Sequence, residues 1–217
     1  MKIIKPSVQL LLPPMDREAF GQWVLEHIEG AYRRCYKSED KICPGSAAKI
    51  IHNMGIKHGH TSPLEHFSFT ALFICDRGVT HEIVRHRLAS YSQESTRYCN
   101  YSGDKFGNEI TVIRPCFLNG RLNAFRIWEN ACQYAESQYF EMLRDGATPQ
   151  EARAVLPSSL KTELEMTADI PEWRHFFKLR CDPAAHPQMR EVALMGLEQA
   201  HDAFPVVFDD LWEQYKP

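Results

Sequence analysis

The chain has 217 residues and a formal net charge of −3, with 44% hydrophobic and 24% charged residues. This length and balance suit one domain with a sizeable core, and they exclude a disordered chain. A protein that holds DNA or RNA through a broad basic field is also excluded, so any phosphate site must consist of a few placed arginines. No apolar stretch approaches the roughly 20 residues that span a bilayer. We therefore expect neither nucleic acid nor membrane as a partner.

Two predicted helices precede the first strand. Asp16 is a candidate N-cap for a helix whose apolar positions run from Phe20 to Tyr32 at helical spacing. Ser46 is a candidate N-cap for a second helix, which extends to about His58 and ends at Gly59. A change to alternating apolar and polar residues then predicts a strand over 66–75.

The remaining elements follow at regular intervals. The first of them is a short helix over 81–86 capped by Thr80, followed by irregular chain to about Asn108 and a strand over 110–113. Two helices come next, one over 122–143 that ends at Gly146 and one from Pro149 to Pro157 that is capped by Thr148. A strand over 160–166 and three helices that begin at Pro171, Pro187 and Pro205 complete the chain. Helices and few strands in this order predict an α+β fold in which one sheet is flanked by helices.

Seven cysteines are scattered along the chain, and no two stand as a CxxC pair. An odd number without metal-binding spacing is typical of reduced thiols in the cytoplasm. The N-terminal apolar run Val8–Leu12 is interrupted by Pro13 and Pro14, so no signal-peptide core is expected. We therefore expect a cytoplasmic protein.

The segment Arg85–Arg97 is the most unusual part of the sequence. It holds three arginines, one histidine and three serines, and its only aliphatic residue larger than alanine is Leu88. A core element could not tolerate this composition, because buried charges must be paired. Two interpretations remain open, a solvated helix end with its loop, and an anion site in which arginine forks and serine hydroxyls bind phosphate.

The spacing of this segment resembles a known family signature. The pattern R-H-R-x-x-S-x-x-x-x-S-x-R is formed by Arg85, His86, Arg87, Ser90, Ser95 and Arg97, and it is similar to that of flavin-dependent thymidylate synthases. Further matching stretches, in order, are Ala31–Tyr36, His58–His66 (H-x-S/T-P-x-E-H), Glu151–Pro157 (A-R-x-x-L-P) and Glu172–Arg180 (E-W-x-x-F-x-x-x-R). Departures from the common pattern are Ser92, Gln93, Asp169 and Pro171, where many members have Asn, Glu, Asn and Arg.

The resemblance, which covers roughly residues 20 to 205, implies a fold, a reaction and a set of roles. The fold would be a single catalytic domain over 1–217 with a central, mostly antiparallel sheet flanked by helices. The reaction would convert dUMP to dTMP with 5,10-methylenetetrahydrofolate as carbon donor and NADPH as reductant through FAD, in a homotetramer with active sites at subunit interfaces. Residues implied for dUMP are Glu82, Arg85, Gln93, Glu94, Ser95, Thr96, Arg97, Arg153 and Arg180. Residues implied for FAD are His60, Ser62, Arg85, His86, Arg87, Gln93, Asp169 and His175.

Carbon 5 of uracil is a poor nucleophile, and two mechanisms can activate it. A cysteine thiolate can attack carbon 6, but no cysteine has an evident activating neighbourhood, although Cys99 lies near Arg97. Alternatively, a cation at the pyrimidine edge stabilises charge on N3 and O4. We expect Arg180 to be this catalytic residue, without a covalent cysteine. Ser95 is the second catalytic candidate; without an evident His–Asp partner it is interpreted as a phosphate or sugar donor.

Other hypotheses stay open at this point. His52, His58, His60 and His66 are close in sequence, but no HExxH or paired Cys/His spacing supports a metal, and we expect none. Arg153 and Arg180 could form surface ion pairs. The chain could also be another flavin- or folate-dependent pyrimidine methyltransferase, or a non-catalytic protein that binds nucleotides or RNA.

Overall fold

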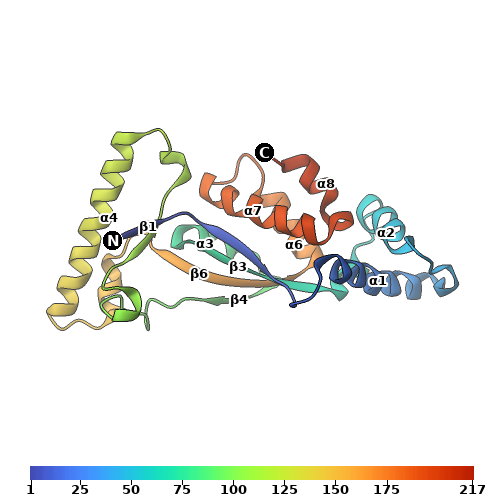
Figure 1. Ribbon diagram of the computed structural model, residues 1–217, viewed down its shortest axis with the longest axis horizontal. Helices are drawn as coiled ribbons and strands as arrows, with labels where there is room; N and C mark the ends of the chain where they lie inside the picture. The colour runs from blue at the N-terminus through green and yellow to red at the C-terminus, as the bar shows by residue number, and fades with distance from the viewer.

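The computed structural model describes residues 1–217 and shows an elongated molecule built on one antiparallel sheet (Figure 1). The strand order is β2 (Ser7–Leu11), β3 (Ser68–Asp76), β6 (Lys161–Asp169) and β4 (Ala89–Gln93). A separate pair of short parallel strands is formed by β1 (Lys2–Ile4) and β5 (Thr111–Ile113). The predicted α+β class with a mostly antiparallel sheet is confirmed.

The alternation of apolar residues explains how the sheet forms its core. On β6, Leu164 and Met166 are buried while the intervening Glu163 and Glu165 are exposed. Met166 pairs with Ala71 of β3 in the antiparallel register, so the buried positions of both strands share one face. The sequence predicted both strands from this pattern within a few residues of their observed ends.

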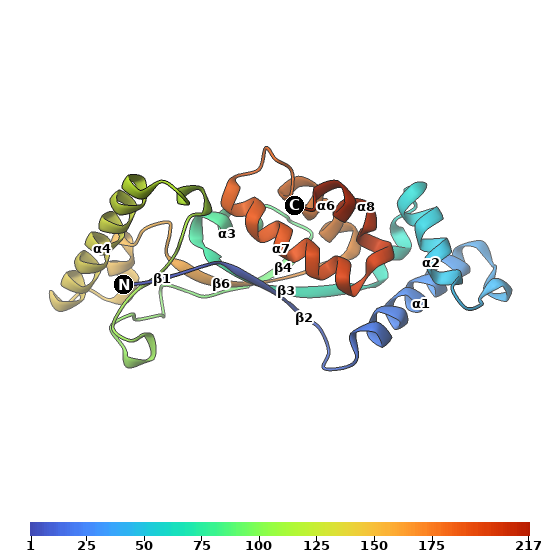
Figure 2. The same ribbon diagram turned by 45° about the horizontal axis from the view of Figure 1, so that its top comes forward.

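Three C-terminal helices cover the apolar face of the sheet, as Figures 1 and 2 show. They are α6 (Ile170–Arg180), α7 (Pro187–Ala203) and α8 (Pro205–Tyr215), and all begin at or beside the expected prolines. Trp173 of α6 stacks on Phe69 of β3 with 4.8 Å between ring centroids, and its indole N–H donates to the Phe69 carbonyl at 3.1 Å. These contacts fix α6 against the sheet, and α6 carries several of the expected site residues.

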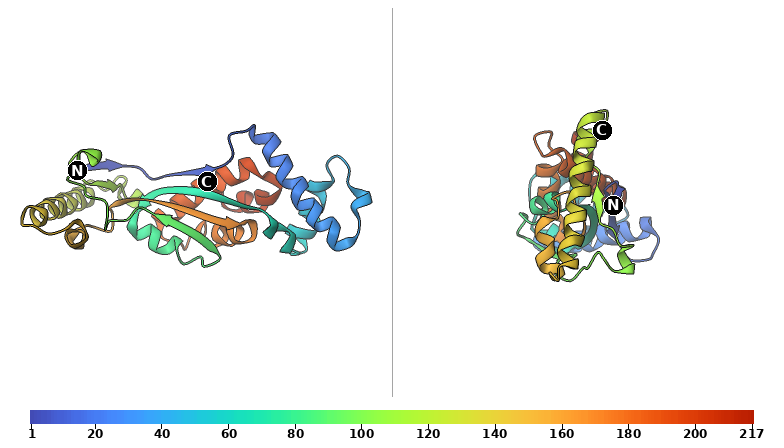
Figure 3. Two further views of the ribbon diagram at one scale, coloured as in Figure 1. Left: turned by 90° about the horizontal axis from the view of Figure 1, so that it is seen from below. Right: turned by 90° about the vertical axis from the view of Figure 1, so that its left-hand side faces the viewer.

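The two remaining long helices lie at opposite ends of the molecule (Figure 3). At one end, α1 (Arg17–Tyr36) is capped by Asp16, as predicted, since the Asp16 carboxylate accepts from Ala19 N at 2.8 Å. At the other end, α4 (Leu122–Arg144) packs against α5 (Pro149–Ala152) and the 3-10 turn Arg153–Val155. This second end has its own small core of Tyr101, Ile110, Val112, Cys132, Tyr139, Ala152 and Leu160.

Two predicted helix caps are wrong by a few residues. The second helix, α2 (Ser46–Ile50), is capped by Gly45, because the Ser46 hydroxyl donates instead to the buried Glu29 carboxylate at 2.7 Å. It continues as a π-helical turn over Ile51–Lys57, close to the predicted end. The short helix α3 (Arg77–Ile83) is capped by Asp76, whose carboxylate accepts from Val79 N at 2.8 Å, so Thr80 lies within it.

The expectation of irregular chain after His86 is wrong for residues 89–93. This stretch is the edge strand β4, which pairs with β6 so that Ser90 lies opposite Thr167 and Ser92 opposite Glu165. Its serines give no apolar alternation, and its hydrogen-bond partners come from a strand that lies far along the chain. The signature segment is therefore held at the rim of the sheet. No helix of the structure has both the length and the apolar composition needed to cross a bilayer.

Candidate active site

Most of the expected site residues fall into three groups on this scaffold. The helix-end group surrounds the C-terminal half of α6 and contains Glu82, His86, His175 and Arg180. The cleft group lies between α3 and the turn after α5 and contains Thr96 and Arg153, with Ser95 and Arg97 beside Thr96 in the chain. The turn group contains His60 and Ser62, which lie near the end of α1.

Arg180, the last residue of α6, is held by residues at the end of α3 and just beyond it. Its Nε donates to His86 Nε2 at 3.1 Å, while Nη1 donates to Glu82 Oε2 and Nη2 to the Glu82 carbonyl, both at 2.9 Å. Only 14% of the Arg180 side chain is exposed. A guanidinium has five N–H donors, so two remain for another partner. The structure therefore brings Arg180 into contact with two residues that lie 94 and 98 positions before it in the chain.

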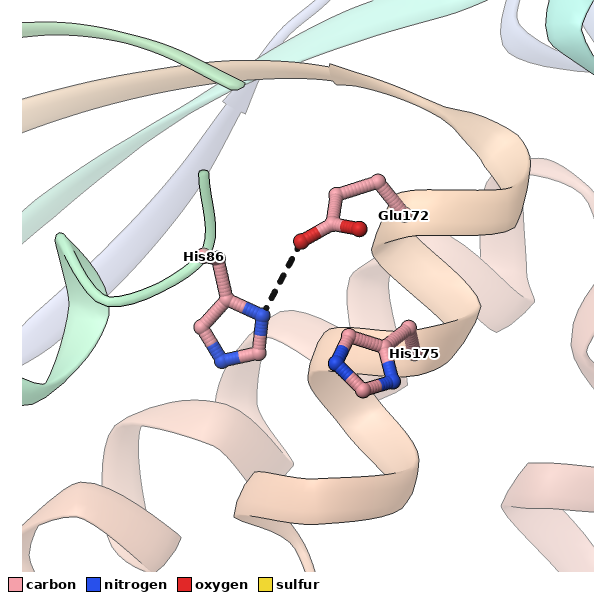
Figure 4. A group of neighbouring side chains, drawn as sticks. All are labelled: His86, Glu172 and His175. Carbon is pink, nitrogen blue, oxygen red and sulfur yellow. Dashed lines mark hydrogen bonds and ion pairs between the residues drawn. The ribbon is translucent and has the colours of Figure 1, made fainter. Parts of the chain in front are cut away.

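His86 is a buried, uncharged ring in this group. Burial, followed by electrostatic interaction with Arg180 and His175, lowers the pKa of His86 to about 4. Its Nδ1 lies 3.1 Å from Glu172 Oε1, and its ring centroid lies 5.3 Å from that of His175. Figure 4 shows Glu172 and His175 beside the His86 ring, both on α6. Sequence reasoning missed Glu172, although the residue begins the quoted E-W-x-x-F-x-x-x-R stretch.

His86, Glu172 and His175 place one possible ligand atom each within 4.8 Å of one another, which raises the question of a metal ion. A metal on His86 Nδ1 would leave the proton on Nε2, since a neutral imidazole carries one proton. That proton would then face the Arg180 Nε–H, a donor against a donor at 3.1 Å. The position of Arg180 therefore opposes a metal at this cluster.

The cleft group forms a cationic hollow of about 270 Å³ next to α3. Arg153 Nη1 donates to the Thr96 hydroxyl at 3.3 Å, and Arg77 and His81 of α3 line the same cleft. Arg77 and His81 were not among the expected site residues. Three basic side chains with one hydroxyl are suited to a phosphate group. α3 borders both this cleft and the helix-end group, because Glu82, the residue after His81, contacts Arg180.

Two expected nucleotide residues make internal contacts that shape the cleft. Gln93 donates to the hydroxyls of Thr80 at 3.1 Å and Thr162 at 3.2 Å, which ties β4 to α3 and β6. The Glu94 carboxylate accepts from Tyr101 at 3.2 Å and from Lys161 at 3.0 Å. These bonds already use much of the hydrogen-bonding capacity of both side chains.

The remaining residues of the signature are open to a ligand. Arg85, Arg87 and Arg97 are exposed, and none of them forms an ion pair in the structure. The Ser95 hydroxyl accepts from the Arg97 amide at 3.4 Å and contacts no histidine or carboxylate, so no base is in place to make it a nucleophile. This geometry favours the interpretation of Ser95 as a donor to phosphate or sugar.

The cysteine nearest the signature is also unsuited to nucleophilic attack. Burial, together with the nearby Glu94 carboxylate, raises the pKa of the Cys99 thiol. A raised pKa disfavours the thiolate that attack on a pyrimidine ring requires.

The turn group and the start of α6 complete the set expected for a flavin. His60 Nδ1 lies 2.9 Å from the Tyr36 hydroxyl, and Tyr32 donates to the His60 carbonyl at 2.7 Å, so the turn is fixed to α1. Asp169 caps α6 by accepting from Glu172 N at 2.9 Å. Pro171 takes the second position of that helix, where its missing N–H costs nothing.

The fold and a family comparison define the class of protein. A family model described as "Thymidylate synthase complementing protein" matches residues 24–206. A solved structure, a UMP/dUMP methylase from Streptomyces cacaoi bound with 5-Br dUMP, is similar with a TM-score of 0.78 and 23% sequence identity, over 99% of this chain and 98% of that one. Because the sequence identity is only 23%, the comparison with the methylase shows a shared fold and no more.

Curated relatives give the family. A flavin-dependent thymidylate synthase from Geobacter sulfurreducens is 32% identical over 187 residues, which are 83% of this chain and 78% of the relative. Another from Pyrococcus furiosus is 36% identical over 181 residues, which are 83% of this chain and 68% of the relative. The chain therefore belongs to the flavin-dependent thymidylate synthase family, as its motifs suggested, and the expected methyltransferase class of enzyme is confirmed with it.

Proposed function

We propose that this protein converts dUMP to dTMP, with 5,10-methylenetetrahydrofolate as carbon donor and NADPH as reductant through FAD, and without a covalent cysteine. The observation that carries the proposal is the position of Arg180 at the end of α6. Its guanidinium is largely buried, oriented by Glu82 and His86, and left with two N–H groups for a ligand. A cation fixed in this way suits an anion that develops during a reaction better than one that is merely bound.

The chemistry assigned to Arg180 is electrostatic. The free N–H groups would donate to an oxygen at the pyrimidine edge, where negative charge grows as carbon 5 becomes nucleophilic. In a site with little water, such a preorganised donor accelerates reactions by about 10²–10³-fold. Burial keeps the Cys99 thiol protonated, which supports this route over attack by a thiolate.

The phosphate of dUMP is assigned to the cleft group. Arg153 and Thr96 already lie 3.3 Å apart, with Arg77 and His81 beside them. Ser95 and Arg97 follow β4 at the edge of the same region. Together they offer guanidinium and hydroxyl donors without a free carboxylate, because Lys161 and Tyr101 engage Glu94. Charge-assisted hydrogen bonds of this kind are the strong ones for phosphate.

Flavin, when bound, supplies the hydride that turns the transferred methylene into a methyl group. The donor set of this chain fits such a group, because Arg85 and Arg87 are exposed cations without ion-pair partners. We assign to flavin these two arginines, His175 of the helix-end group, His60 and Ser62 of the turn group, and Asp169. His86 was also expected beside flavin, but its side chain is 2% exposed and both ring nitrogens are engaged, so we assign it to the orientation of Arg180. Gln93 and Arg85 would contact both flavin and nucleotide.

The separation of the groups supports a homotetramer with composite sites. The cleft group and the helix-end group take different residues of α3, Arg77 and His81 in the first and Glu82 in the second, whereas one nucleotide must reach both a phosphate site and a base-edge site. Leu88 and Tyr98, next to the signature, are 76% and 80% exposed. A partner subunit that covers these side chains would remove apolar surface from water, which stabilises an assembly. We propose that residues 1–217 form one catalytic domain whose sites are completed by partner copies of the chain.

Tritium release tests this proposal directly. The purified protein is incubated with dUMP labelled at carbon 5, methylenetetrahydrofolate and NADPH, and the tritium that enters water is counted. We expect release that depends on every component, together with the visible absorption band of a bound flavin. Release from labelled UMP but not from dUMP would assign the chain to another pyrimidine, and a colourless protein without release would refute the proposal.

A further inference from the structure

Glu172 has no role in the proposed chemistry, although it is buried and contacts a residue that holds Arg180. Only 9% of its side chain and 2% of the His86 side chain are exposed. Glu172 Oε1 lies 3.1 Å from His86 Nδ1, and His86 Nε2 lies 3.1 Å from Arg180 Nε. The three side chains thus form a continuous series of contacts that ends at the guanidinium. Figure 4 draws the first of these contacts, between Glu172 and His86.

The donors and acceptors in this series have only one consistent arrangement. A guanidinium carries donors and no acceptor, so His86 Nε2 must be the bare nitrogen that accepts from Arg180. The proton of the neutral ring is then on Nδ1, where it faces Glu172 Oε1. A carboxylate accepts this N–H, and it accepts best when ionised.

We infer that Glu172 is a positioning residue that fixes the tautomer of His86 and thereby the orientation of Arg180. The inference deepens the proposed function, since it rests on Arg180 acting at the pyrimidine edge. Without an acceptor at Nδ1, a proton there would be buried and unpaired, and only the contact with Arg180 would oppose its transfer to Nε2. That proton would meet the Arg180 Nε–H and turn the guanidinium away from its present direction.

The other contacts of His86 hold the ring in place but do not select a tautomer. Phe176 packs against it edge-on at 4.9 Å, and the Tyr91 hydroxyl donates to the His86 backbone carbonyl at 2.5 Å. His175 is the other titratable side chain beside the ring, at 5.3 Å between centroids, and no hydrogen bond joins the two. Glu172 is thus the one acceptor available to Nδ1.

The test compares Glu172→Leu with Glu172→Gln. Leucine keeps the volume and removes the acceptor, whereas glutamine keeps an acceptor oxygen and loses the charge. Nitrogen NMR of the histidine rings reads the tautomer of His86, whose signals are assigned from their loss in His86→Gln. Glu198→Leu is the matched control, because it removes an exposed carboxylate from α7 that forms no ion pair. Thermal unfolding verifies that each variant folds.

We expect the Nδ1–H tautomer in the unaltered protein and in Glu172→Gln, and a shift towards Nε2–H in Glu172→Leu. The Arg180 Nε–H signal, protected by its bond to His86, should broaden in the same variant. The turnover number kcat should fall about tenfold in Glu172→Leu with little change in KM for dUMP, and glutamine should restore most of it.

An unchanged tautomer and Arg180 signal in a folded Glu172→Leu protein would overturn the inference, as would equal losses of kcat in both variants. The NMR readout needs no substrate, so it separates this inference from the proposed function. If the unaltered protein made no dTMP but its His86 tautomer depended on Glu172, the positioning role would stand and the proposed reaction would fail.

Discussion

Arg180→Ala removes the residue to which the account assigns most of the catalysis. The change deletes three hydrogen bonds to His86 and Glu82, and it deletes the two remaining N–H groups that would face the pyrimidine. The first set only orients the guanidinium, whereas we propose that the second stabilises charge that develops in the transition state. Loss of one such preorganised donor costs about 2.7–4 kcal/mol, or a factor of about 10²–10³ in kcat.

The split between kcat and KM is the informative result. We expect KM for dUMP to change by less than about tenfold, because the phosphate is assigned to the separate cleft group. Tritium release at saturating and subsaturating dUMP measures both constants. Arg144→Ala is the control, since this arginine is 73% exposed and its ion pair with Glu141 spans 3.8 Å. An equal loss in binding and turnover, or turnover that survives the change, would refute the assignment of Arg180.

Three further predictions concern neighbouring residues. Cys99→Ala should keep kcat within about twofold in the same assay, since loss of a protonated thiol removes no nucleophile; abolished turnover would revive a covalent mechanism. Arg153→Ala should raise KM for dUMP about tenfold and leave kcat nearly unchanged, because it removes a uniform phosphate contact; a selective loss of kcat would contradict this. The third prediction concerns pH. The pKa of His86 is about 4 in the folded chain and near 6.5 in the unfolded chain, so only the unfolded state takes up this proton between those values. Stability should therefore fall as pH drops from about 6.5 to about 4, and thermal unfolding of His86→Gln should show a smaller fall; the same fall in both proteins would refute the assignment.

Local patterns in the sequence were sufficient for most of the fold. Leu164 and Met166 alternate with polar residues because one face of β6 is buried. The prolines at the start of α6, α7 and α8 set the backbone of the first turn of each helix, which is a local effect. The errors have a common physical cause. The edge strand β4 exists because β6 supplies its partners, and its own serines carry no signal. Likewise, Ser46 fails as a cap because a buried carboxylate from α1 attracts its hydroxyl.

The candidate site was predictable in its parts but not in its connections. The signature spacing identified Arg85–Arg97, and the stretch that ends at Arg180 identified the cation. The contact of Glu172 with His86 joins residues 86 positions apart, and neither segment carries a sequence pattern that predicts this contact. Arg77 lines the cleft from within α3, because this helix begins three residues before the predicted cap Thr80. Such neighbourhoods depend on packing, which residue spacing alone does not encode.

Analysis of the nucleotide product tests the central claim most directly. The protein is supplied with dUMP, NADPH and methylenetetrahydrofolate labelled in its methylene carbon, and the nucleotides and the intact chain are then weighed by mass spectrometry. We predict dTMP that carries the label, its near loss in Arg180→Ala, and no nucleotide attached to a cysteine. Unlabelled dUMP alone, or a covalent adduct between the chain and the nucleotide, would contradict it.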